Sequence, residues 1–306
     1  MQILKWAGAI LLASQVIYAG DAVSLAGHTR DVNVVACSGD GKLIVSGAED
    51  EKTFLWDVAS KQEIASPTGG GAVMSVSISP DGKRVASGER YHKVNLLDRS
   101  GKVVKVLEGH EAAVIATGFT ADSKTLMTFS LDGGLRYWDA AAGAPQGAVK
   151  VALDSYSSGA FSADGKWFAG GTSGGNLYLY NVAMRKAGIK IQPGTMVKAL
   201  AFSPDGRTVA AALNNESVRV YSTADGKEIG VVAGVDANGL AFSPDGSKLA
   251  AAGHDNEVKV IDAIGLKMLS SMKGHGRTVR SVCFLPDGRS IVSGSFDMTV
   301  RIWSGM

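Results

Sequence analysis

A serine, a histidine and an aspartate recur together at a fixed spacing along the chain. Ser46 follows His28 by 18 residues, and Asp50 follows Ser46 by four. The same three residue types stand at His275, Ser293 and Asp297. In a hydrolase these types serve as nucleophile, general base and orienting carboxylate. The first reaction that these residues suggest is therefore acyl transfer.

The number of copies argues against catalysis. A third copy places Thr128 between His110 and Asp132. An enzyme needs one such site, and the sequence around these residues contains no nucleophile elbow or oxyanion-hole motif. We therefore expect no catalytic residues here.

The elements that carry these residues are strands. The stretch Gly274 to Trp303 reads GHGRTVRSVCFLPDGRSIVSGSFDMTVRIW. Val282 and Phe284 point to one face of a strand, because successive side chains alternate. Pro286, Asp287 and Gly288 form a turn, in which Gly supplies a positive φ without steric penalty. The pattern predicts three strands, the last ending at Trp303.

This pattern recurs seven times. The turn aspartate falls at intervals of 40 to 42 residues, at Asp40, Asp81, Asp122, Asp164, Asp205, Asp245 and Asp287. A fixed period of this length is typical of repeat architectures. No linker or change of composition interrupts the series, so residues 20–306 are predicted to form one domain.

The repeats resemble those of the WD-repeat β-propeller family over residues 22–304. Gly27-His28, Asp50 and Trp56-Asp57 show the full pattern. The resemblance implies an all-β fold: one seven-bladed propeller of four-stranded antiparallel blades. It also implies that Ala22 to Leu25 supply the strand that completes the last blade.

The same resemblance implies a structural role for the recurring polar residues. The family uses them, with a tryptophan, as a buried hydrogen-bond relay that ties strands and a loop together. The relay residues are His28, Ser46, Asp50 and Trp56, then His110, Thr128, Asp132 and Trp138, then His275, Ser293, Asp297 and Trp303.

Blades two, four, five and six depart from this pattern. They lack Gly-His and replace the tryptophan by Leu97, Tyr180, Tyr221 and Ile261. Their strands stay apolar, so we expect packing to hold these blades together. The weakest signal lies between Ala140 and Ser158, around blade four.

The first 19 residues differ from the rest. Lys5 precedes an apolar run that ends in small residues, which predicts a signal peptide cleaved after Ala19. The chain then resembles an exported, bacterial-type member of the family, periplasmic or secreted, with no membrane span after cleavage. A buried N-terminal strand and an uncleaved anchor, which would tether a cytoplasmic scaffold, are the alternatives.

Charge and cysteines add little about partners. A net charge of +2 does not predict nucleic-acid binding.

Cys37 and Cys283 belong to the first and last blades, which should be neighbours. Two buried free thiols are favoured because the geometric window for a bridge is narrow. A disulfide in an oxidising compartment is the alternative.

In this family, loops at the narrow end of the channel carry function. The resemblance implies a non-enzymatic scaffold, a monomer or part of a hetero-complex, that presents this face to a protein or peptide, with no cofactor or metal. The candidate contact residues mix Met, Arg and other anchor types: Asp31, Asn33, Glu49, Met74, Arg90, Ile115, Leu131, Met196, Lys198, Asn238, His254, Arg280 and Phe296. The alternative is an exported enzyme or small-ligand binder with its site at the channel mouth.

Overall fold

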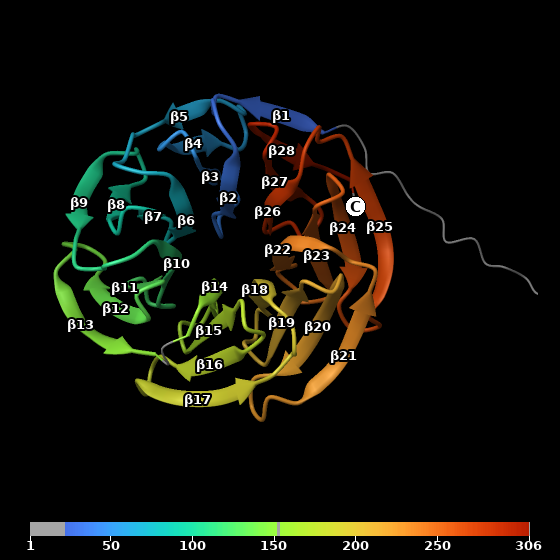
Figure 1. Ribbon diagram of the computed structural model, residues 1–306. Helices are drawn as coiled ribbons and strands as arrows, with labels where there is room; N and C mark the ends of the chain where they lie inside the picture. Colours follow the sequence, from blue (N-terminus) through green and yellow to red (C-terminus); the bar gives the residue numbers. More distant parts are fainter. Residues whose placement is uncertain (1–21, 152–153, 306) are drawn as a thin grey trace, which may run out of the picture.

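Seven antiparallel sheets of four strands each stand around a central channel (Figure 1). The computed structural model describes residues 22–151 and 154–305. Within these residues there is no helix, and the predicted seven-bladed all-β propeller is confirmed. In Figure 1 the first strand of each blade lies at the channel and the fourth on the circumference.

In blades 1 to 6 the strands follow chain order from the channel outwards. Blade 1 contains β2 (Val32–Cys37), β3 (Leu43–Ala48), β4 (Thr53–Asp57) and β5 (Glu63–Ala65). Blade 2 contains β6 (Val73–Ile78), β7 (Arg84–Glu89), β8 (Val94–Asp98) and β9 (Val103–Leu107). Blade 3 contains β10 (Val114–Phe119), β11 (Thr125–Ser130), β12 (Gly134–Asp139) and β13 (Pro145–Lys150). Blade 4 contains β14 (Tyr156–Phe161), β15 (Trp167–Thr172), β16 (Leu177–Asn181) and β17 (Lys186–Ile191).

Blades 5 and 6 follow the same order, whereas blade 7 takes its outermost strand from the N-terminal part of the chain. Blade 5 contains β18 (Val197–Phe202), β19 (Thr208–Leu213), β20 (Ser217–Ser222) and β21 (Glu228–Ala233). Blade 6 contains β22 (Ala237–Phe242), β23 (Lys248–Gly253), β24 (Glu257–Asp262) and β25 (Lys267–Lys273). Blade 7 contains β26 (Val279–Phe284), β27 (Ile291–Ser295), β28 (Thr299–Trp303) and, as its outermost strand, β1 (Val23–Ala26).

The predicted turn joins β26 to β27. Gly288 has φ 62°, in the left-handed region that glycine adopts at low cost. The Asp287 carboxylate accepts the Arg289 N–H at 2.8 Å. These local contacts set the hairpin that begins the blade.

The first and last parts of the chain close the ring. β1 pairs antiparallel with β28, and Leu25 lies opposite Val300. Leu25 is buried, with 3% of its surface exposed. The predicted closure by an N-terminal strand is confirmed.

A disulfide joins the same two blades. Cys37 of β2 and Cys283 of β26 are bonded, with their Cα atoms 6.0 Å apart. The prediction of two free thiols is therefore wrong. The strands run close together, since the Val35 N–H donates to the Ser281 hydroxyl at 3.1 Å, and this brings the two Cα atoms into bridging range.

The core lies between neighbouring blades. At Gly294, a Cβ would lie 2.7 Å from Cγ1 of Val32 in blade 1, so the glycine of the Ser-Gly motif permits this close approach. In the blades that lack the closing tryptophan of the pattern, Leu97, Tyr180, Tyr221 and Ile261 are all buried. Packing therefore replaces the missing tryptophan, as expected.

The predicted signal peptide, residues 1–19, lies outside the described residues. In the part of the chain that is described, there is no helix of the length and apolarity that crossing a membrane requires.

The channel mouth as the candidate functional site

The first strand of every blade contains the same irregularity. In β2, Val32 pairs with Ala48 and Val34 pairs with Gly47, so Asn33 has no opposite residue. This is a β-bulge, which redirects a side chain out of the regular ladder. The register shifts at the equivalent position in the other six blades. The bypassed residues, here called the bulge ring, are Asn33, Met74, Ile115, Ser157, Lys198, Asn238 and Arg280.

The bulge ring faces the channel. A cavity of about 270 Å³ is lined by all seven of its residues. Each blade thus contributes one side chain whose direction is set by the bulge. The channel surface is therefore assembled from residues more than 200 positions apart in the chain, such as Asn33 and Arg280.

A second set of seven residues, one per blade, follows the second strand of each blade. The Glu49 N–H, just after β3, donates to the Asp31 carbonyl at 2.9 Å, and the Phe296 N–H donates to the Thr278 carbonyl at 3.0 Å. The same bond recurs in every blade and fixes the loop between the second and third strands. The residues so held, here called the rim, are Glu49, Arg90, Leu131, Ser173, Asn214, His254 and Phe296.

Four rim residues and four bulge-ring residues enclose a mouth cavity of about 310 Å³. It lies off-centre, over blades 6, 7, 1 and 2. Its lining mixes aromatic, thioether, amide and charged groups, from Asn33, Glu49, Met74, Arg90, Asn238, His254, Thr278, Arg280 and Phe296. Such a mixture suits recognition of a peptide segment, which offers both apolar and polar groups.

Most charges at the mouth are paired. Arg90 donates to the Glu49 carboxylate at 2.6 Å, and the Asn33 amide donates to the same oxygen at 3.1 Å. Lys198 forms an ion pair with Asp236 of the next blade. Arg280 is different: its hydrogen bond is to the Asn238 carbonyl, at 3.4 Å.

The candidate contact residues divide into three groups. Asn33, Glu49, Met74, Arg90, Asn238, His254, Arg280 and Phe296 line the mouth cavity. Ile115 and Lys198 lie in the channel. Asp31, Leu131 and Met196 line neither cavity.

Within the bulge ring and the lining of the mouth cavity, sequence reasoning missed Ser157 and Thr278. Ser157 belongs to blade four, where the repeat signal is weakest, although its place after Tyr156 matches that of Asn33 after Val32. Thr278 precedes β26, and its hydroxyl contacts Nδ1 of His254 at 3.2 Å. Counting back from the turn aspartates would have found both, because Ser157 precedes Asp164 by seven residues, as Asn33 precedes Asp40, and Thr278 precedes Asp287 by nine, as Asp31 precedes Asp40.

The recurring polar residues are hydrogen-bonded in one order in three blades. Trp303 Nε1–H donates to the Ser293 hydroxyl at 2.8 Å, and this hydroxyl lies 2.7 Å from Nε2 of His275. His275 Nδ1 is 2.8 Å from the Asp297 carboxylate. The network assigns the proton to Nδ1, so that Nε2 accepts from the serine.

The other two copies have matching distances. In blade 1, Trp56 to Ser46 is 2.9 Å, Ser46 to His28 is 2.8 Å, and His28 to Asp50 is 2.9 Å. In blade 3, the bonds among Trp138, Thr128, His110 and Asp132 measure 2.9, 2.8 and 3.2 Å. Each network links a loop to the second and third strands.

The electrostatics of these networks suit a buried neutral histidine. Burial lowers the pKa of His110 to about 4, although Asp132 acts to raise it. Burial acts to raise the pKa of Asp297, but hydrogen bonds from Thr299, Gly276 and His275 hold it at about 2. The hydroxyls of Ser46, Thr128 and Ser293 belong to fully buried residues. A substrate carbonyl could not reach them, so the triad-like spacing does not form an accessible nucleophile.

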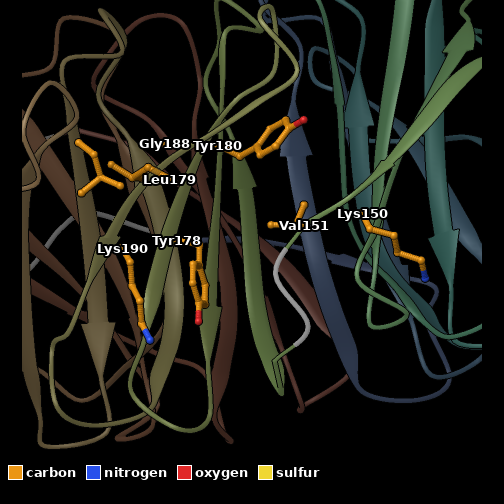
Figure 2. A pocket seen from close by; sticks show the side chains of 8 residues that line it. Lys150, Val151, Tyr178, Leu179, Tyr180, Gly188 and Lys190 are labelled. Carbon is orange, nitrogen blue, oxygen red and sulfur yellow. The ribbon is translucent and has the colours of Figure 1, made fainter.

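A further cavity, of about 240 Å³, lies on the outer side of the ring between β13 and the β16–β17 hairpin (Figure 2). Figure 2 shows Lys190 beside Tyr178, and the ammonium is 5.5 Å from the ring centre. The Tyr178 hydroxyl donates to Asp154 at 3.0 Å, and Lys150 donates to the Asp132 carbonyl. This cavity is lined by two neighbouring blades, whereas the mouth cavity gathers side chains from four, so the channel mouth is the better candidate site.

Across residues 22–151 and 154–305, no three His, Cys, Asp or Glu side chains gather in a group that could hold a metal ion.

The fold and the mouth define a seven-bladed propeller with a ligand-sized opening at one end of its channel. The sequence profile of the family "WD domain, G-beta repeat" matches six stretches: residues 22–57, 61–98, 101–139, 189–222, 229–262 and 266–304. The chain belongs to the WD40 repeat family. The unmatched residues 140–188 contain most of blade 4, which lacks the His and Trp of the pattern.

Named relatives come from animals and plants. The chain is 31% identical over 188 residues to "WD repeat-containing protein SL1-17" of Schistosoma mansoni, covering 60% of this chain and 62% of that protein. It is 23% identical over 281 residues to "Transcriptional corepressor LEUNIG_HOMOLOG" of Arabidopsis thaliana, covering 88% and 35%. It is 27% identical over 228 residues to "U3 small nucleolar RNA-associated protein 15 homolog" of Xenopus tropicalis, covering 74% and 36%.

The chain thus spans less than two thirds of each of these relatives. Another relative is named as the transcription factor unc-37 of Caenorhabditis elegans, to which the chain is 29% identical over 115 residues.

The predicted export is wrong. The relatives are eukaryotic proteins, named for transcription and for a nucleolar RNA, which points away from a periplasmic or secreted bacterial-type member. One lysine before a short apolar run is a weak signal, because apolar runs of that length also occur in ordinary buried segments.

Proposed function

We propose that this propeller is a non-enzymatic scaffold that binds a segment of a protein or peptide partner at its channel mouth. In this proposal it acts as a monomer or as one subunit of a hetero-complex. The rim and the bulge ring form the contact surface, and no cofactor takes part.

The observation that supports the proposal is the sevenfold bulge. It directs one side chain from every blade toward the channel, where all seven line one cavity. The lining of the mouth cavity includes Phe296, Met74 and Arg90, which are residue types that anchor protein interfaces. A cavity of about 310 Å³ accommodates a few side chains of an inserted segment.

The alternative of an enzyme at the channel mouth has weaker support. A general acid or base would need a carboxylate or histidine free to exchange a proton with substrate. Glu49 is bonded to Arg90 and Asn33, and His254 contacts Thr278. These contacts favour a binding surface over acid-base chemistry.

Site-specific cross-linking tests the proposal. A photoreactive benzophenone side chain is introduced at Phe296 in the mouth, or, as a control, at Ile264, which is 84% exposed in the turn between β24 and the outer strand β25. Extracts of the cells that naturally contain the chain are irradiated with each protein, and the cross-linked products are identified by mass spectrometry.

The expected result is a defined protein product from the Phe296 position that is absent from the Ile264 position. The product should also disappear when Arg90→Glu is added to the Phe296 probe, and persist when Arg207→Glu is added near the other end. Equal products from both positions would exclude the mouth as the contact surface. A tightly bound small molecule with no protein product would support the ligand-binder alternative.

A further inference from the structure

Arg280 is the bulge-ring residue of blade 7, and it has no acidic partner. Across the described residues, the structure gives its guanidinium no ion pair, and its hydrogen bond is a long one to the Asn238 carbonyl. Burial alone lowers its pKa, with no contribution from a nearby carboxylate. Arg280 is half-buried, and a cation withdrawn from water without a counter-ion is costly, so such groups are normally paired.

Comparison with blade 5 shows which counter-ion is missing. Lys198 occupies the same bulge position and forms an ion pair with Asp236, the residue just before the first strand of the next blade. The equivalent residue beside Arg280 is Asp31, just before β2 of blade 1. Asp31 instead pairs with Arg277, at 3.1 Å. Asp31, whose position corresponds to that of Asp236, is therefore paired with Arg277 and not with Arg280.

The surroundings of Arg280 offer further donors. Asn238 lines the same cavity, and its amide nitrogen is buried without a hydrogen-bond partner in the described part of the chain. A half-turn of the amide exchanges its nitrogen and oxygen, which can present N–H groups to a ligand. Met74 supplies an apolar wall on the same cavity.

We propose that Arg280, with Asn238, forms a subsite for a carboxylate that a bound peptide inserts into the channel mouth. The guanidinium offers two parallel N–H donors that match the two oxygens of a carboxylate. A carboxylate carries a single negative charge, which one arginine neutralises, whereas a phosphate group would keep a second charge uncompensated in the cavity. The proposal rests on the peptide-binding function proposed above and names the chemistry that its partner must carry.

A small probe tests the subsite independently of any partner. Sodium acetate is titrated into the whole protein against sodium chloride at constant ionic strength, and the arginine Nε–Hε signals are followed by NMR. The Arg280 signal is assigned by its loss in Arg280→Gln. The expected result is a saturable shift of this signal with acetate. An equal shift with chloride, or a larger one with inorganic phosphate, would overturn the carboxylate assignment.

Two peptides then distinguish the sources of the carboxylate. One is acetyl-Gly-Gly-Asp-Gly-Gly-amide, which carries it on a side chain, and the other is acetyl-Gly-Gly-Gly-Gly-Gly with a free C-terminus. The peptide that fits should bind more tightly than acetate, and Arg280→Gln should weaken it on the order of tenfold. Arg207→Gln removes an exposed arginine near the opposite end and should leave binding unchanged.

The outcomes separate this inference from the proposed function. If the Phe296 cross-link persists in Arg280→Gln and acetate causes no shift, the mouth still binds a protein and the subsite is wrong. If acetate shifts the signal but no protein cross-links, the subsite stands and serves a small carboxylate ligand. Failure of both experiments would reject both proposals.

Discussion

Ser293 and Ser87 occupy the same position of the second strand in blades 7 and 2, and both are fully buried. The hydroxyl of Ser293 contacts both Trp303 and His275. The hydroxyl of Ser87 has no hydrogen-bond partner in the described part of the chain. The same side chain is thus satisfied in one blade and unsatisfied in the other.

We expect opposite effects when each serine is replaced by alanine. Ser293→Ala leaves the Trp303 N–H without its acceptor and should cost about 1–3 kcal/mol of unfolding free energy. Ser87→Ala removes a buried polar group that has no partner and should be neutral or slightly stabilising. Urea unfolding of both variants measures the difference. Equal losses would contradict a structural role for the relay.

The N-terminal strand should contribute to stability through ring closure. Deleting Ala22 to Leu25 removes the pairing of β1 with β28 and exposes the edge of blade 7. The melting temperature should fall, because the buried Leu25 is lost with the strand. An unchanged melting temperature would reject the closure.

The disulfide should stabilise the same junction. Cys37 and Cys283 are separated by 246 residues, so their bond restricts a very long loop of the unfolded chain. Comparing oxidised and reduced protein in urea should show a loss of about 2–5 kcal/mol on reduction. The double variant Cys37→Ser/Cys283→Ser is the control, and its stability should not respond to reductant.

Arg280 and Lys198 hold equivalent positions, but substitution should affect them differently. Arg280→Met removes a half-buried charge without a counter-ion and should raise the melting temperature, by about 2–4 °C for each kcal/mol gained. Lys198→Met leaves Asp236 without its partner and should lower it. A fall in both variants would show that Arg280 has a favourable partner in solution.

Acid should destabilise the fold in two stages. The pKa of His110 is lowered from 6.5 to about 4, so the unfolded chain takes up this proton first and stability falls between about pH 6.5 and 4. The pKa of Asp297 is lowered from 3.8 to about 2, so its contribution is lost between about pH 4 and 2. Melting temperatures at stepped pH values measure both stages. His110→Gln should flatten the first stage, and an unaltered slope would contradict the assignment.

The repeat pattern was enough to predict the blades, because alternation and turn residues act locally and recur seven times. The bulges could not be read from it, since a single residue skipped in the pairing leaves the apolar pattern almost unchanged. The Cys37 to Cys283 bond depends on how closely blades 1 and 7 approach. Arg280 has no acidic partner because Asp31 pairs with Arg277 instead. Which of the two arginines contacts Asp31 depends on the three-dimensional structure and cannot be read from the repeat pattern.

The bulge also bears on how the binding surface can vary. Because the residue at each bulge is skipped by the strand pairing, its side chain is less constrained by the sheet than those of its neighbours. Asparagine, methionine, isoleucine, serine, lysine and arginine all occupy this position in one chain. Six such sites, all but the Lys198 site with its ion pair to Asp236, form a natural set for randomisation, so a library built on them could be selected for new ligands.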